Sequence, residues 1–332
     1  RNYDGRDPNL VDIPSCCVCY VKPGTLMCSR CNFMPYFSHK KDCKKLEKFV
    51  GVMEREAEHL KACQFGFGLG PPGIAFEVHV GVYWGFIETR EYMRARLAVV
   101  NHLEQMNWEL ESKRGWEMVA ADMQDMLRLS ASDNIGMRYR FPFVLINLNR
   151  DDDAYCFLRY WMEDWDSTYE EKEKKHTRST VGDWLYPKEV GARFGDILEQ
   201  RPDEKYHHKY TELSLLVASA VLKMRVVAAL EAKNLREDAD YDPDEHKNQK
   251  KMLMRLLDLI DTNNKSMLPA LINPKPLRDA GDPDYYSPGK PSEARMVLDS
   301  ACRPWARIPG AEELLFARFG SRLPTYNTSV SL

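Results

Sequence analysis

The chain has 332 residues, of which 44% are hydrophobic, so it is long enough to bury a sizeable core and suggests one large domain with a small module. Its 47 Lys and Arg against 50 Asp and Glu give a net charge of -3, which excludes the overall positive field of a protein that binds phosphate backbones non-specifically. No stretch approaches the ~20 consecutive apolar residues that span a bilayer, and no apolar signal segment opens the sequence, so we expect a cytoplasmic or nuclear protein without a membrane partner.

The first feature along the chain is a cluster of cysteines. Six of the nine cysteines lie within the first 43 residues, and in a reducing compartment such a cluster indicates metal ligands. The potential donors follow the pattern Cys16-x2-Cys19-x8-Cys28-x2-Cys31-x7-His39-x3-Cys43. Each Cys-x2-Cys pair presents two thiolates on a tight turn, and the His-x3-Cys pair places two donors one helical turn apart. Thiolate and imidazole donors in a tetrahedral set favour Zn2+.

The residues from 28 to 43 resemble a MYND-type zinc finger, specifically that of the fungal MYND family. The resemblance rests on the segments CSRC (28–31), MPY (34–36) and HKKDC (39–43). It implies eight ligands interleaved around two zincs. The residues that match a complete site are Cys28, Cys31, His39 and Cys43, whereas Cys16 and Cys19 match half of the other site.

The finger predicted over 16–43 is shorter than the family pattern. The family's third ligand pair lies in a stretch of the type Cys-Ser-x2-Cys-Gln-x2-Asp-Trp, but here Tyr36 is followed directly by Phe37. In the family this stretch also carries residues that grip proline-containing peptides. The resemblance therefore implies a finger that has lost part of its metal core together with part of its peptide groove.

Other uses of the same donors remain open. Cys17 would complete a weak site with the first Cys-x2-Cys pair, although side chains of adjacent cysteines tend to point apart. A zinc-ribbon arrangement would combine the two Cys-x2-Cys pairs and leave His39 and Cys43 unused. We expect the lysines of HKKDCKKLEK (39–48) to form a solvated face rather than a nucleic-acid patch, because two acidic residues dilute them and no aromatic residue interleaves them.

Helical spacing dominates the rest of the chain. A helix and linker are predicted over 44–75, ending in the Gly- and Pro-rich stretch FGFGLGPPGIAF. Strand-like alternation is scarce, so the predicted fold class is mainly α, with a small zinc finger followed by a helix-hairpin domain. The clearest apolar stripes are Phe86, Met93, Leu97 and Val100; Val119, Met123 and Met126; Leu213, Leu216, Val217, Ala220, Val221, Met224 and Val227; and Leu253, Leu256, Leu257 and Ile260.

Two helical regions are expected beyond the linker. Helical hairpins over 76–165 also resemble the fungal family and, more loosely, tetratricopeptide-type helix pairs, and a C-terminal helical region is predicted over 180–320. Its last two helices are expected near 291–302 and 310–319. Trp161 and Trp165 lie at helical spacing, which favours a place in the core.

The segments between these helices carry the polar residues. Charge-rich stretches at 166–180 and 233–251 are expected to be solvated loops or frayed helix ends. Asp133 to Gly136 is expected to join two antiparallel helices, with an acidic or amide side chain as a cap. The run of three aspartates at 151–153 predicts a solvated helix N-terminus rather than a Mg2+ site. The segment 273–291 is expected to be a long loop, packed over the helices by Tyr285 and Tyr286.

Motifs of enzymes are missing from the sequence. MYND-containing SET methyltransferases carry a similar finger, but their Asn-His-Ser type motif is absent, as are Gly-x-Ser-x-Gly, Gly-Lys-Ser/Thr and His-Glu-x2-His. We therefore predict a zinc-binding interaction or adaptor protein without catalytic activity, with transcriptional regulation as one setting. Its expected partner is a protein or a proline-containing peptide, and neither nucleic acid nor a small-molecule substrate is expected. A SET-type methyltransferase is the alternative, disfavoured by its missing motif.

Overall fold

The computed structural model describes residues 3–10, 40–62, 75–78, 80–163, 188–199 and 212–319. These residues are mostly α-helical, and no strand occurs among them beyond one isolated bridge between Val82 and Ser130. The prediction of a mainly α fold is therefore confirmed. The predicted finger at 16–43 lies outside the described residues except for its last four positions.

The chain divides into two compact units. Unit 1 comprises Arg1–Asp7, Leu145–Glu163 and Lys188–Leu332, and unit 2 comprises Pro8–Val144 and Asp164–Pro187. The division falls within one helix, α5 (Met137–Asn147). Each unit has helices of its own and is described in turn.

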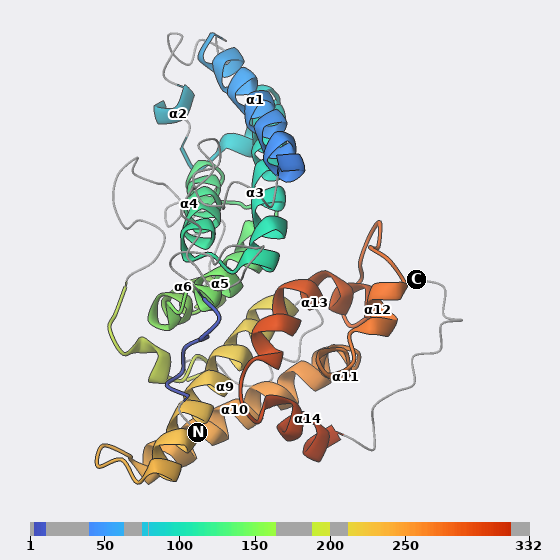
Figure 1. The fold of residues 1–332 in the computed structure, drawn as a ribbon. Helices are drawn as coiled ribbons and strands as arrows, with labels where there is room; N and C mark the ends of the chain where they lie inside the picture. The colour runs from blue at the N-terminus through green and yellow to red at the C-terminus, as the bar shows by residue number, and fades with distance from the viewer. Residues whose placement is uncertain are drawn as a thin grey trace. The chain divides into compact units, whose positions relative to one another are not determined.

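Unit 2 is built on two long helices, α1 (Lys40–Ala62) and α3 (Arg90–Leu110), which lie side by side (Figure 1). The other elements of unit 2 are α2 (Ala75–Val78), the 3-10 turns η1 (Tyr83–Gly85) and η2 (Ile87–Thr89), and α4 (Lys113–Leu129), which packs on α3. The stripe predicted in α4 is confirmed, because Val119, Met123 and Met126 are fully buried.

The start of α3 differs from the prediction. Phe86 was expected to share a helical face with Met93 and Val100, but Phe86 ends η1 in extended backbone and α3 begins only at Arg90. The hydroxyl of Thr89 donates to main-chain oxygens of Tyr83 and Phe86, which holds the two 3-10 turns in place of a continuous helix. Met93 and Val100 are buried as expected.

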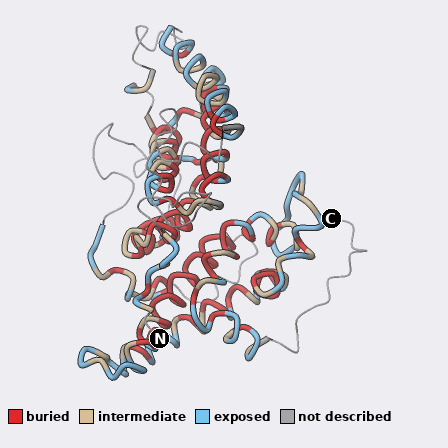
Figure 2. The backbone as a smooth tube through the Cα atoms, in the orientation of Figure 1, coloured by how far each residue is buried: buried red, intermediate tan, exposed pale blue. Residues whose placement is uncertain are grey.

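Unit 1 surrounds a single core helix, α9 (Leu213–Arg236), which packs against α6 (Asp151–Glu163), α10 (Pro243–Asn263) and α13 (Pro291–Ala306). Buried residues run along nearly its whole length (Figure 2), and they include every member of the predicted 213–227 stripe. Among the described residues, α9 is the one helix long and apolar enough to cross a membrane, with a mean hydropathy of 1.9 in its most apolar window. That window is 94% buried within the protein, which is the environment of a core helix.

The remaining elements of unit 1 are short. They are η4 (Ala192–Phe194), α11 (Met267–Ile272), α12 (Lys275–Asp279) and α14 (Ala311–Phe319). The predicted final helix pair is confirmed as α13 and α14. The buried position predicted for Trp161 in α6 is also confirmed, whereas Trp165 lies outside the described residues.

Two predicted loops are partly helical. Within 233–251, α9 continues to Arg236 and α10 starts at Pro243, where the Asp242 carboxylate caps the helix by accepting from the main-chain N–H groups of Asp244 and Glu245. The segment 273–291 contains α12, because Pro274 and the residues after it adopt a short helix. The prediction that tyrosines pack this segment down is wrong, since Tyr285 is 75% and Tyr286 49% exposed. The segment 166–180 lies outside the described residues.

Candidate functional site

Of the six predicted zinc ligands, the structure describes Cys43. It lies in the first turn of α1, and its side chain is only 4% exposed. The ligands outside the described residues are Cys16, Cys19, Cys28, Cys31 and His39. Within the described part of the chain, no three His, Cys, Asp or Glu side chains are grouped to hold a metal. The zinc site therefore stays a prediction.

The first turn of α1 is held against α3 by a polar and an aromatic contact. The ring Nε2 of His102, in α3, lies 3.0 Å from the main-chain oxygen of Asp42. Since a carbonyl oxygen only accepts, this nitrogen carries the proton. The same ring meets Phe49 edge-on, with 5.6 Å between ring centroids. Cys43 is next to Asp42 in the sequence, so it lies on a segment whose position is fixed by contacts with α3.

Of the predicted His-x3-Cys pair, Cys43 lies in α1. His39 directly precedes Lys40, the first residue of α1, and Cys43 follows within the same turn. Side chains four residues apart share one face of a helix. His39 itself lies outside the described residues, so the His-x3-Cys pair stays a prediction from its spacing.

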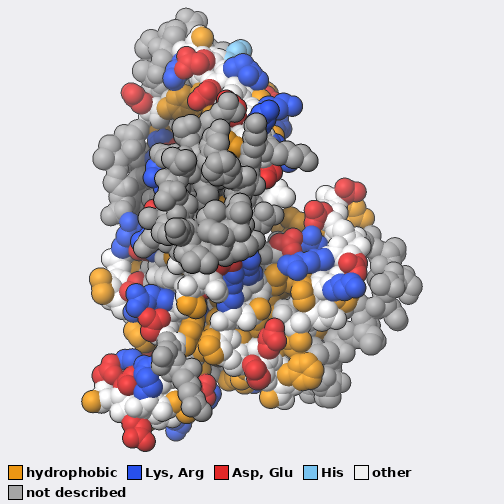
Figure 3. Space-filling view, in the orientation of Figure 1, with side chains coloured by type: hydrophobic (Ala, Val, Ile, Leu, Met, Phe, Trp, Pro, Cys, Tyr) orange, Lys and Arg blue, Asp and Glu red, His pale blue; other side chains and the backbone are white. Residues whose placement is uncertain are grey.

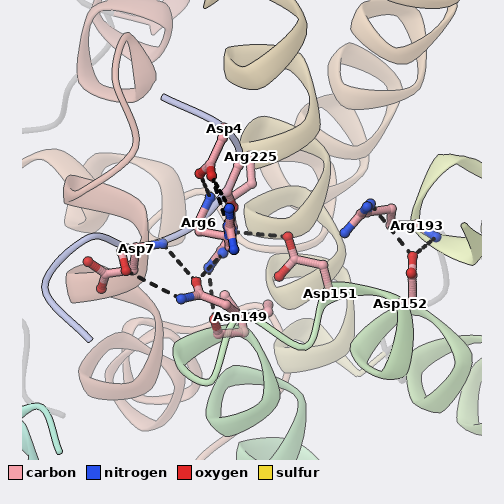
Figure 4. Close-up of polar contacts among 10 residues, drawn as sticks. Asp4, Arg6, Asp7, Asn149, Asp151, Asp152, Arg193 and Arg225 are labelled. Carbon is pink, nitrogen blue, oxygen red and sulfur yellow. Dashed lines mark hydrogen bonds and ion pairs between the residues drawn. The ribbon is translucent and has the colours of Figure 1, made fainter. Parts of the chain in front are cut away.

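A second cluster of polar groups, in unit 1, was missed by the sequence analysis. It centres on Arg225, whose side chain is 4% exposed and projects from the middle of α9 (Figure 4). Its Nη1 donates to the main-chain oxygen of Ile146 at 2.8 Å, and its Nη2 donates to Asn149 Oδ1 at 2.6 Å. Its Nε donates to the main-chain oxygen of Gly5 at 2.7 Å and lies 3.2 Å from Asp151 Oδ2.

Asp151 corrects the prediction of a solvated helix N-terminus. It is the first residue of α6, but its side chain is 5% exposed because it faces Arg225. Burial raises the pKa of this carboxyl to about 6, and the nearby Arg225 opposes that rise. The next two aspartates diverge from it. Asp152 accepts from the main-chain N–H groups of Gly191 and Arg193, and Asp153 pairs with Arg150.

Lys223 is a second cation in the middle of α9, and it is 1% exposed. Its Nζ donates to the main-chain oxygens of Arg193 at 2.7 Å and Gly195 at 2.6 Å, and to Gln249 Oε1 at 2.8 Å. Burial lowers the pKa of Lys223 to about 8. An ammonium group has three donors, and all three are used here. Lys223 therefore anchors the η4 turn and has no donor left for a ligand.

The sequence carries one signal that points to both clusters. Two strongly hydrophilic residues, Lys223 and Arg225, interrupt the mainly apolar stretch 215–230, and buried charges of this kind are retained only with hydrogen-bonding partners. The partners themselves cannot be found by spacing, since they lie 26 to 220 residues away.

On the face drawn in Figure 3, basic and acidic side chains are interspersed with apolar ones.

A comparison of the chain with protein-family models, curated proteins and solved structures finds no match in any of the three.

Proposed function

We propose that this chain is a zinc-binding interaction protein, in which Cys28, Cys31, His39 and Cys43 hold one Zn2+ and the helical units act as a non-catalytic adaptor. The observation that carries the proposal is the spacing Cys-x2-Cys-x7-His-x3-Cys, which supplies four soft donors for one tetrahedral site. Its resemblance to a MYND finger adds the expectation of a protein or proline-containing peptide partner, with transcriptional regulation as one setting.

The helical part of the chain supports this proposal because it fixes the position of the last predicted ligand of the finger. Cys43 is buried in the first turn of α1, and the contact between His102 and Asp42 fixes that turn. A ligand held on a rigid element loses little conformational freedom when the metal binds, which favours tight binding. Thiolate ligands also need a reducing compartment, in keeping with a cytoplasmic or nuclear protein.

The test is the zinc content of the purified chain and of single variants. We expect about one zinc per chain, because structural zinc sites of this class bind with roughly 10–16 kcal/mol. Cys31→Ser and His39→Ala should both lose the metal. Cys17→Ser is the matched control, and it should keep the metal because Cys17 lies outside the set.

The same variants separate this site from a zinc ribbon. If the metal were held by the two Cys-x2-Cys pairs, Cys16→Ser would release it and His39→Ala would not. That pattern, or a ratio near two zincs per chain, would contradict the proposed ligand set.

A further inference from the structure

A short segment near the beginning of the sequence, Tyr3 to Asp7, lies on unit 1 and is held mainly through its own main chain. Asn149 Oδ1 accepts from the main-chain N–H of Asp7 at 2.7 Å, and Asn149 Nδ2 donates to the main-chain oxygen of the same residue at 3.3 Å. Arg225 Nε donates to the main-chain oxygen of Gly5. Paired donor and acceptor contacts to the main chain of one residue bind a peptide with little regard to the side chain of that residue.

Two positions of the segment add selectivity. Gly5 is buried and has a φ of +91°, a conformation that strains any residue with a Cβ. The Asp7 carboxylate pairs with Arg307 Nη1 at 2.7 Å. Asp4 and Arg6 are exposed, and they form an ion pair with each other. The surface thus selects the pattern Gly-x-Asp and is indifferent to the residue between.

The receiving groups keep partners when the segment is taken away. Arg225 Nη1 and Nη2 remain bonded to Ile146 and Asn149, and Nε has Asp151 Oδ2 at 3.2 Å as an alternative acceptor. One oxygen of Asp151, Oδ1, is buried without a hydrogen-bond partner among the described residues. Because no buried cation is left unpaired, exchange of the segment for another peptide carries no large desolvation penalty.

We propose that Asn149, Arg225 and Arg307 form a peptide-binding surface on unit 1, occupied here by the chain's own Tyr3 to Asp7, which takes a Gly-x-Asp peptide of a protein partner that bends at its glycine. The tethered segment competes with that partner, because a covalently linked ligand has an effective concentration in the millimolar range. Binding in trans is therefore weak until the segment is displaced. This surface does not involve the zinc finger, so it stands or falls independently of the metal.

The experiment uses the full chain and a labelled peptide of residues 3–9, acetylated and amidated at its ends, followed by fluorescence anisotropy. In the variant Gly5→Val/Asp7→Ala the tethered segment is weakened while the surface is untouched. We expect this variant to bind the peptide at least ~10-fold more tightly than the wild type, because the competing tethered segment is lost. Arg6→Ala is the matched control and should behave as wild type, since Arg6 does not contact the surface.

Two further binding measurements make the assignment specific. A peptide with the same two substitutions should not bind, and adding Asn149→Gly to the weakened variant should abolish binding, because glycine tolerates the φ of +58° at this position but removes the amide. Equal affinity in wild type and weakened variant would overturn the proposal. Loss of helical signal in the weakened variant would also overturn it, because the segment would then be part of the fold. If the wild type is a dimer and the peptide dissociates it, the surface binds the segment of a second copy of this chain. That result would overturn the assignment to a different protein partner.

Discussion

At the scale of single residues, the two buried cations of α9 show how a buried charge is tolerated. Lys223 and Arg225 lie two positions apart, so their side chains leave the helix in different directions and reach different partners. One holds the η4 turn and the other joins the α5–α6 turn to the segment at Gly5. Each ties together parts of unit 1 that are distant in the sequence.

Lys223→Met is expected to destabilise unit 1 by about 2–4 kcal/mol, because the main-chain oxygens of Arg193 and Gly195 would lose their buried donor. Urea unfolding followed by circular dichroism measures this loss. Lys250→Met, at an exposed position of the neighbouring α10, is the matched control and should change stability by no more than about 0.5 kcal/mol. Equal effects of the two substitutions would contradict the role given to Lys223.

The sequence alone could not place these contacts. A lysine in an apolar helix predicts that partners exist, but main-chain oxygens of Arg193 and Gly195 carry no signature in the sequence. Asp151 illustrates the same limit, since a run of three aspartates at a helix start is ordinarily solvated. Only the return of α9 against α6 makes the first of the three a buried partner of Arg225.

At the scale of elements, the junction of α3 and α4 depends on one close approach. Glu111 ends α3 with a φ of 54°, and the hydroxyl of Ser112 accepts from the main-chain N–H of Gly115 at 3.3 Å. A Cβ at Gly115 would lie 2.3 Å from Asn107 Oδ1, and Asn107 is fully buried. Glycine is thus required for the packing of the two helices rather than for its backbone freedom.

Gly115→Ala therefore reverses the usual sign of a glycine-to-alanine change in a helix. Alanine ordinarily stabilises a helix by roughly 0.5–1 kcal/mol, but here the forced shift of Asn107 should destabilise unit 2 by about 1–3 kcal/mol. Gly51→Ala in α1 is the matched control, because its Cβ would have no atom closer than 3.8 Å and should stabilise the helix. Thermal unfolding of both variants measures the difference. A stabilising Gly115→Ala would contradict the close approach.

Helix periodicity predicted the elements better than their ends. The apolar stripe from Leu213 to Val227 can be recognised from local spacing in the sequence, and all of its residues are buried in the structure. The start of α10 lies in a charge-rich stretch that we expected to be a loop or a frayed helix end. Asp242 followed by Pro243 is nevertheless a common signal for the start of a helix. Charge density indicates exposure, and an exposed face is compatible with a helix as well as with a loop.

At the scale of the whole molecule, the mainly α class could be predicted because it sums many local patterns. The segments that make up each unit could not be predicted, because unit 1 joins residues 3–7, α6 and the helices from α9 onward through contacts between segments that are distant in the sequence. The zinc ligands were proposed from spacing. Cys43 is the one whose surroundings the structure describes, and the contacts of α1 with α3 are what connect it to unit 2.

The last prediction follows from that connection and concerns metal removal from the full chain. If Cys43 is a zinc ligand, chelation frees the first turn of α1, and the contacts of Asp42 and Phe49 with His102 should loosen. Hydrogen exchange should then accelerate in α1 and in the part of α3 around His102, since local stability follows local packing. The core helix α9 is the internal control, because its contacts lie in unit 1, and its exchange should stay unchanged. Equal acceleration in α9, or none in α1, would mean that the metal does not act through Cys43.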